Sequence, residues 1–172
     1  MRQGRDRKAR FAVIARDEAA TARIAAAVAR AARTGDVLAL AGDLGSGKTA
    51  FARGFVQALA GPAEEVPSPT FTLVQSYAAG DGRTIHHFDL YRIDDPEDAW
   101  ELGIEEAFAD GITLIEWPER LGRLLPLDRL DVRFDMPPGG GASERRITLV
   151  AGPSWKDRLA PLRTALGADG DG

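Results

Sequence analysis

The chain has 172 residues, of which 44% are hydrophobic and 28% charged, and it contains no cysteine. This composition is typical of one globular domain, and the lack of cysteine excludes disulfides, thiolate metal sites and thiol nucleophiles. No apolar run is long enough to span a bilayer, so we expect a cytoplasmic protein that contacts no membrane. A net charge of −4 gives no general attraction to nucleic acid, so we expect any contact with RNA to be local or made through a partner.

Strands and helices alternate along the first half of the chain. The apolar run at 36–41 is nearly continuous, as in a strand buried on both faces of a parallel sheet. The Ala-rich segment that precedes it has acidic residues in its first turn and a glycine just beyond its end, which indicates a helix. We expect a strand at 11–15, a helix at 17–33 and a strand at 36–41. A glycine-rich loop at 42–48, a helix at 49–60 and a proline-rich loop at 61–71 follow.

The second half of the chain begins with a predicted hairpin. Residues 72–77 and 84–91 flank the turn sequence AAGDGR as its two arms. After it we predict a helix at 95–110 that is interrupted at Gly103, a strand at 111–117 and a short helix at 118–125. A strand with one buried face at 130–136, a strand at 145–152 and a closing helix at 154–166 follow. We expect residues 11–166 to form the domain, and the basic start, 1–10, and the tail, 167–172, to be disordered.

A phosphate-binding loop is predicted between the strand at 36–41 and the helix that follows it. Residues 42–49, GDLGSGKT, match G-x-x-x-x-G-K-[ST], in which glycines let backbone N–H groups point at phosphate oxygens beside a helix N-terminus. Lys48, at a loop we expect to be exposed, would bind the β and γ phosphates and serve catalysis, and the Thr49 hydroxyl would ligate magnesium. The residues predicted to bind nucleotide are Gly42, Asp43, Leu44, Gly45, Ser46, Gly47, Lys48 and Thr49.

The sequence lacks the segment with which many GTPases recognise guanine. Many GTPases read guanine with an Asn/Thr-Lys-x-Asp segment, but this sequence contains no asparagine and no Thr-Lys pair. ATP is therefore favoured.

Two further segments have residues suited to a triphosphate site. In SPTFTLV, Pro69 stiffens a loop that places the Thr70 hydroxyl near its tip, as in a switch loop; an ordinary polar lead into a strand is the alternative. In HHFDLYR, Asp89 ends a strand-like run, where it can orient water or accept a proton; a surface pair of Asp89 with Arg92 is the alternative. We interpret His86 and His87 as structural.

A third segment, ITLIEWPE, delivers Glu116 to the end of an apolar strand. P-loop proteins place a magnesium carboxylate there, usually an aspartate, and the longer glutamate can reach the ion directly or through water. We expect Asp89 and Glu116 to face solvent or metal. Trp117 can cover the nucleotide or belong to the core.

In this order, GDLGSGKT, SPTFTLV, HHFDLYR and IEWPER resemble the TsaE (YjeE-type) family of bacterial P-loop ATPases over about residues 16–152. The resemblance implies an α/β fold, a single small P-loop NTPase domain with a mostly parallel, mixed central sheet flanked by helices. It also implies that Thr49 and Glu116 ligate magnesium, that Asp89 is needed for hydrolysis, that Thr70 lies on a mobile loop and that Asp17 lies near the nucleotide.

The resemblance implies an activity as well. Proteins of this family hydrolyse ATP while bound to a complex of TsaB and TsaD, which makes threonylcarbamoyladenosine on transfer RNA, so this chain would contact tRNA only through the complex. Two alternatives remain open, a small-molecule P-loop kinase and an ATP-dependent scaffold that does not hydrolyse. The hairpin sequence PPGGGASERR matches the family poorly, which leaves the roles of Arg145 and Arg146 open.

Overall fold

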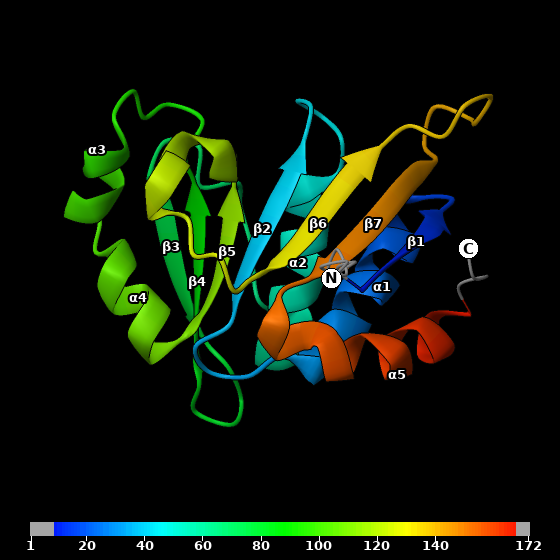
Figure 1. Cartoon of the computed structure of the whole chain (residues 1–172), viewed down its shortest axis with the longest axis horizontal. Coiled ribbons are helices and arrows are strands. Elements are labelled where there is room, and N and C mark those ends of the chain that lie inside the picture. Colours follow the sequence, from blue (N-terminus) through cyan, green and yellow to red (C-terminus); the bar gives the residue numbers. More distant parts are fainter. Residues whose placement is uncertain (1–8, 168–172) are drawn as a thin grey trace, which may run out of the picture.

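The computed structural model describes residues 9–167, and within them the chain forms a seven-stranded mixed sheet with helices on both faces (Figure 1). The strands are β1 Arg10–Ala15, β2 Val37–Gly42, β3 Val74–Ala78, β4 Thr84–Asp89, β5 Ile112–Glu116, β6 Leu130–Asp135 and β7 Arg145–Ala151. The helices are α1 Glu18–Ala31, α2 Lys48–Ala60, α3 Pro96–Glu101, α4 Ile104–Asp110 and α5 Lys156–Leu166.

The centre of the sheet is parallel and its edges are antiparallel. The strand order is β1-β7-β6-β2-β5-β4-β3. Strand β2 pairs parallel with β5 and β6, and β4 pairs parallel with β5, whereas β7 pairs antiparallel with β6 and β1 and β3 pairs antiparallel with β4. The fold is therefore the predicted α/β domain. The carboxyl ends of β2, β4 and β5 meet at one edge, where ligands bind in open α/β sheets.

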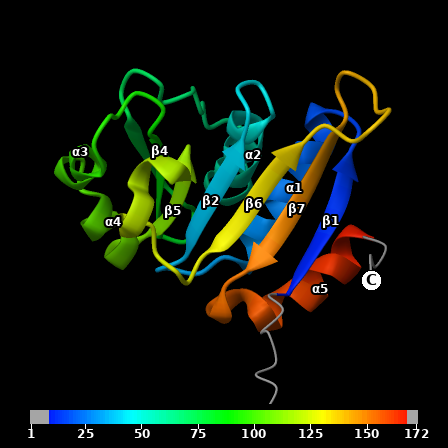
Figure 2. The same ribbon diagram turned by 45° about the horizontal axis from the view of Figure 1, so that its top comes forward.

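Apolar side chains fill both faces of the sheet. On one face α1, α2 and α5 pack through residues such as Ile24, Phe55 and Leu159. On the other face α3 and α4 cover β4 and β5 through residues such as Ile104 and Ile115. Figures 1 and 2 show these two helical layers on opposite sides of the sheet. Within residues 9–167, none of the helices has both the length and the apolar character needed to cross a membrane.

Most predicted elements are confirmed, with small differences at their ends. Strand β1 begins at Arg10, within the start that we expected to be disordered, while residues 1–8 and 168–172 lie outside the described part of the chain. The predicted helix at 95–110 is divided into α3 and α4 by Gly103, whose φ of 80° an L side chain rarely adopts. The strand with one buried face was predicted to run to residue 136, but β6 ends at Asp135, and Met136 after it is 67% exposed.

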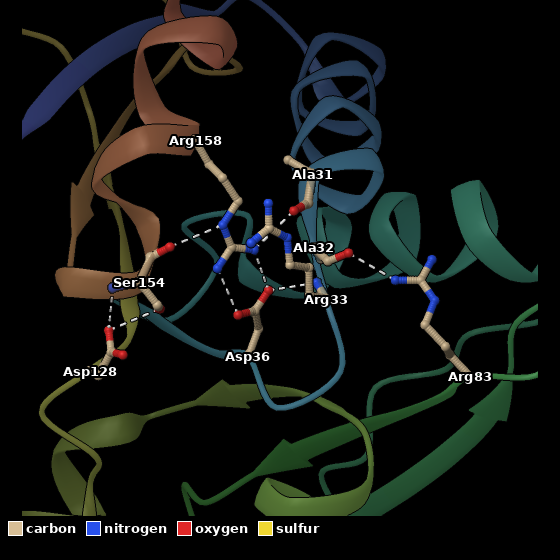
Figure 3. A network of polar contacts seen from close by, with 8 residues as sticks. All are labelled: Ala31, Ala32, Arg33, Asp36, Arg83, Asp128, Ser154 and Arg158. Carbon is tan, nitrogen blue, oxygen red and sulfur yellow. Dashed lines mark hydrogen bonds and ion pairs between the residues drawn. The ribbon is translucent and has the colours of Figure 1, made fainter.

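A buried ion pair ties α5 to the loop between α1 and β2 (Figure 3). Both nitrogens at the end of the Arg158 side chain donate to the Asp36 carboxylate, at 2.6 and 2.9 Å, and Arg158 also donates to the backbone oxygens of Ala31 and Ser154. The backbone N–H of Arg33 donates to the same carboxylate at 2.6 Å. Because Asp36 and Arg158 are both buried, this contact anchors the last helix to the start of the central strand.

We expect Arg158→Met to lower the free energy of unfolding by about 3–5 kcal/mol, because it leaves the buried Asp36 carboxylate without its cation. For a chain of this length the corresponding drop in Tm is roughly 6–20 °C. The double variant Asp36→Asn/Arg158→Met removes both charges and should lose less stability than Arg158→Met alone. Denaturant unfolding measures the change.

A matched control for this prediction is Arg53→Met. Its ion pair with Glu18 is solvent-exposed, and its other contact is a long hydrogen bond of 3.3 Å to the backbone oxygen of Val66. The variant should therefore cost about 1 kcal/mol, well below the loss expected for Arg158→Met. Equal losses for Arg158→Met and Arg53→Met would show that the Asp36 contact has no special role in stability.

Candidate functional site

The glycine-rich loop joins β2 to α2 at the carboxyl edge of the sheet. Strand β2 ends at Gly42, α2 begins at Lys48, and the helix cap Gly47 has a φ of 107° that favours glycine. A Cβ atom on Gly42 would lie 2.9 Å from the backbone oxygen of Phe134, so only glycine fits beside β6. The sequence therefore folds as predicted, into a tight loop that leads into a helix N-terminus, a common anion-binding arrangement.

A cavity of about 250 Å³ opens at this loop. Its lining brings together most of the residues that the sequence predicted: Leu44, Gly45, Ser46, Gly47, Lys48, Thr49, Thr70, Asp89, Glu116 and Trp117. They come from the loop, from the N-terminus of α2, from the proline-rich segment and from the ends of β4 and β5. The parallel register places Asp89 directly opposite Glu116, which explains why two carboxylates distant in sequence line the same cavity.

Lys48 is held by the loop itself. Its Nζ donates to the backbone oxygens of Gly42 at 2.5 Å and Asp43 at 2.8 Å, and it lies 4.1 Å from the centre of the Trp117 ring. The loop is exposed at residues 43–45, as expected, but the Lys48 side chain is only 5% exposed. This burial lowers the pKa of the Lys48 ammonium from its ordinary value, and the nearby carboxylate of Glu116 partly opposes that effect.

Thr49 and Glu116 are in direct contact. The Thr49 hydroxyl donates to Oε1 of Glu116 at 3.0 Å, with Oε2 at 3.2 Å. Glu116 is buried, because β5 is covered on both faces, and it lines the cavity. The Thr49 hydroxyl and the Glu116 carboxylate together offer hard oxygen ligands of the kind that magnesium prefers.

Asp89 is buried too, and it lines the cavity rather than facing open solvent. Its Oδ2 accepts from the Thr70 hydroxyl at 3.2 Å, and its Oδ1 accepts from the backbone N–H of Tyr91 at 3.0 Å. The predicted alternative, a surface pair with Arg92, does not occur within residues 9–167. Arg92 instead lies over the ring of Phe71, 4.5 Å from its centre. Asp89 therefore connects the proline-rich loop to the cavity.

The cavity suits a phosphate chain with a magnesium ion. The hydroxyl of Ser46 is buried in the loop and has no hydrogen-bond partner within the described residues. No group of three or more acidic, histidine or cysteine side chains among residues 9–167 could hold a metal alone. Magnesium is usually held by one or two protein ligands together with phosphates and water.

Comparison with known proteins decides the family. The sequence model described as "Threonylcarbamoyl adenosine biosynthesis protein TsaE" matches residues 15–146. The chain belongs to the TsaE family.

Relatives and a solved structure agree with this assignment. The chain is 38% identical over 124 residues to the tRNA threonylcarbamoyladenosine biosynthesis protein TsaE of Rickettsia felis, with 72% of each chain covered. It is 40% identical over 132 residues to the TsaE protein of Bacillus subtilis, with 76% of this chain and 79% of the relative covered. The crystal structure of Bacillus subtilis YdiB superposes with a TM-score of 0.72 at 33% identity, covering 93% of this chain and 95% of that one.

Three predicted residues of this TsaE-family chain, Asp17, Gly42 and Asp43, do not line the cavity. Asp17 caps α1, and its Oδ1 accepts from the backbone N–H of Ala20 at 2.8 Å. Asp43 contributes its backbone oxygen to Lys48. Sequence reasoning also missed a contact, because His87, interpreted as structural, lies 2.6 Å from Glu116. The signal for it was available: His87 is two residues before Asp89, so the two side chains share a face of one strand.

Arg145, whose role the sequence left open, binds the glycine-rich loop. Its side chain donates to the backbone oxygens of Ser46 at 3.1 Å and Gly45 at 3.2 Å, and also to those of Ala142 and Glu144. These contacts hold the oxygens of the loop toward β7. Arg145 thus couples the β6–β7 hairpin to the loop.

We expect Arg145→Ala to weaken ATP binding by about tenfold, since two hydrogen bonds that hold the loop are lost. Arg145→Lys keeps the charge without the planar fork of donors, so it separates loop geometry from simple charge attraction and should recover only part of the affinity. Isothermal titration of the purified variants measures both effects. Wild-type affinity in Arg145→Ala would contradict the role assigned to this contact.

Proposed function

We propose that this TsaE-family chain binds ATP with magnesium and hydrolyses it, and that it acts with TsaB and TsaD in making threonylcarbamoyladenosine on transfer RNA. The observation that carries the nucleotide part is the contact between Thr49 and Glu116 beside the buried ammonium of Lys48, at the N-terminus of α2. The pathway part rests on family membership and on the names of the relatives from Rickettsia felis and Bacillus subtilis.

Each group in the cavity suits one task in this proposal. Lys48 and the loop N–H groups bind phosphate oxygens, and Thr49 and Glu116 hold magnesium. Magnesium, when bound, neutralises charge that develops on the phosphate oxygens. Asp89 orients the attacking water or accepts its proton. Trp117 lies next to Lys48 and provides an apolar wall for the nucleotide.

The short segment after β5 supports ATP hydrolysis with protein partners more than phosphate transfer to a small acceptor. The cavity of about 250 Å³ is formed by the glycine-rich loop and its neighbours. Between the end of β5 and the start of β6 the chain has only a 3-10 helix, Pro118–Leu124, and a short connection. That segment is too short for the longer lid insertion that nucleotide-type kinases add over the acceptor.

Measurement of phosphate release tests the proposal. The purified chain is assayed alone, with TsaB and TsaD, and with small-molecule acceptors, each with and without magnesium. Inorganic phosphate that depends on TsaB and TsaD supports the proposal. Formation of a phosphorylated small molecule would identify a kinase instead, and ATP binding without turnover in the complex would identify a scaffold.

A further inference from the structure

His87 and His86 are neighbours on β4 but serve opposite faces of the sheet. Strand residues alternate between faces, so His87 shares its face with Asp89 and points toward α2 and the glycine-rich loop. His86 points the other way, where its Nε2 lies 2.8 Å from the Asp110 carboxylate of α4. Only one of the two histidines therefore reaches the cavity side of the sheet.

His87 contacts the end of β5 diagonally. In the parallel register it lies opposite Leu114, two residues before Glu116, and its Nε2 lies 2.6 Å from Oε2 of that glutamate. The two side chains are 0% and 4% exposed. An ionised carboxylate only accepts hydrogen bonds, so Nε2 carries the proton and donates it. The other ring nitrogen, Nδ1, has no hydrogen-bond partner within the described residues, so Glu116 is the polar partner of this ring.

Glu116 thus receives two donors from two different elements. The Thr49 hydroxyl approaches from the start of α2, and His87 approaches from β4. A glutamate has one more rotatable bond than the aspartate usual at this place, so its carboxylate has more positions to adopt. With Oε2 held by His87, the carboxylate stays beside the Thr49 hydroxyl.

We propose that His87 is a positioning residue, which fixes the Glu116 carboxylate next to Thr49 so that magnesium meets a preformed pair of oxygen ligands. The inference rests on the proposed binding of magnesium and ATP and deepens it. Residues that hydrogen-bond to a metal ligand orient it, and their loss commonly lowers metal affinity by about 10- to 100-fold. A buried pair with a merely structural role would instead change the stability of the fold and leave the magnesium dependence of the folded protein intact.

Three variants separate these roles. His87→Leu removes the donor, His87→Gln retains an amide N–H at nearly the reach of Nε2, and His87→Asn carries a similar amide that is too short to reach Oε2. His86→Gln is the matched control, because it alters the adjacent histidine on the opposite face. All four are first compared with the wild type for Tm without nucleotide.

Isothermal titration with ATP, in excess magnesium and in excess chelator, gives the expected result. The gain in ATP affinity due to magnesium should fall by about 10- to 100-fold in His87→Leu and His87→Asn, and His87→Gln should recover most of it. Affinity in chelator should stay at the wild-type value. His86→Gln should match the wild type throughout. Should His87→Leu fail to fold, the contrast between Gln and Asn at this position still decides the question.

A double-mutant cycle tests whether His87 acts through Glu116. If it does, His87→Leu should cause no further loss of magnesium dependence in a Glu116→Ala background, whereas independent roles would give additive losses and overturn the inference. In the nucleotide-free protein, nitrogen NMR should show the His87 proton on Nε2, and Glu116→Ala should shift that signal. A proton on Nδ1 instead would overturn the assigned contact.

The outcomes also separate this inference from the function on which it rests. If the wild-type chain gains no ATP affinity from magnesium, the proposed function fails and the positioning role fails with it. If the wild type gains affinity and His87→Asn gains just as much, the positioning role alone is wrong.

Discussion

Lys48→Met is expected to weaken ATP binding by roughly 30- to 140-fold, equivalent to about 2–3 kcal/mol, because a charge-assisted contact to phosphate is lost. Methionine keeps an unbranched stem beside Trp117, so the change removes the ammonium more than the packing. Two backbone oxygens, those of Gly42 and Asp43, also lose their donor. Titration calorimetry with magnesium present measures the affinity.

Lys156→Met is the matched control for this variant. It changes the net charge by the same amount at the start of α5, away from the residues that line the cavity. Its ATP affinity should equal that of the wild type. Wild-type affinity in Lys48→Met as well would remove the basis for a phosphate-binding loop.

Asp89→Asn is expected to lower the rate of ATP hydrolysis in the complex with TsaB and TsaD by about a hundredfold or more, while ATP affinity changes little. Asparagine keeps an oxygen that can accept from the backbone N–H of Tyr91, and it removes the charge needed to orient water or accept a proton. Phosphate release and ATP affinity are therefore measured on the same preparation.

The control for Asp89 is Asp81→Asn, at the exposed turn between β3 and β4, which should hydrolyse ATP at the wild-type rate. If Asp89→Asn also turns over at that rate, Asp89 has no catalytic role. It would then be an anchor for the proline-rich loop, through its contact with Thr70.

The fold could be predicted from local patterns because they agree with the tertiary environment. The nearly continuous apolar run at 36–41 arises because β2 is central, with Leu38 and Leu40 in one apolar cluster and Val37 in the other. The alternation at Leu130, Val132 and Phe134 likewise arises because β6 buries one face. Which strands are neighbours could not be read from these patterns, since pairing depends on crossovers between elements distant in the sequence.

The site was predictable wherever its chemistry lies within one short segment. The glycine-rich loop is such a segment, and Glu116 follows from the end of an apolar strand. Burial of Lys48, Asp89 and Glu116 was not predictable, because it depends on which segments cover the cavity. The contact of Arg145 with the oxygens of Gly45 and Ser46 joins residues about a hundred positions apart, and no pattern in the sequence connects them.

The position of the Asp36–Arg158 pair has a practical consequence for work on the activity. Asp36 precedes β2 and Gly42 ends it, so the stabilising pair and the phosphate loop lie at opposite ends of one six-residue strand, about 20 Å apart. Substitutions so far apart usually have additive effects. Stability can therefore be changed at the base of the sheet, through this ion pair, without altering the opposite edge that lines the cavity.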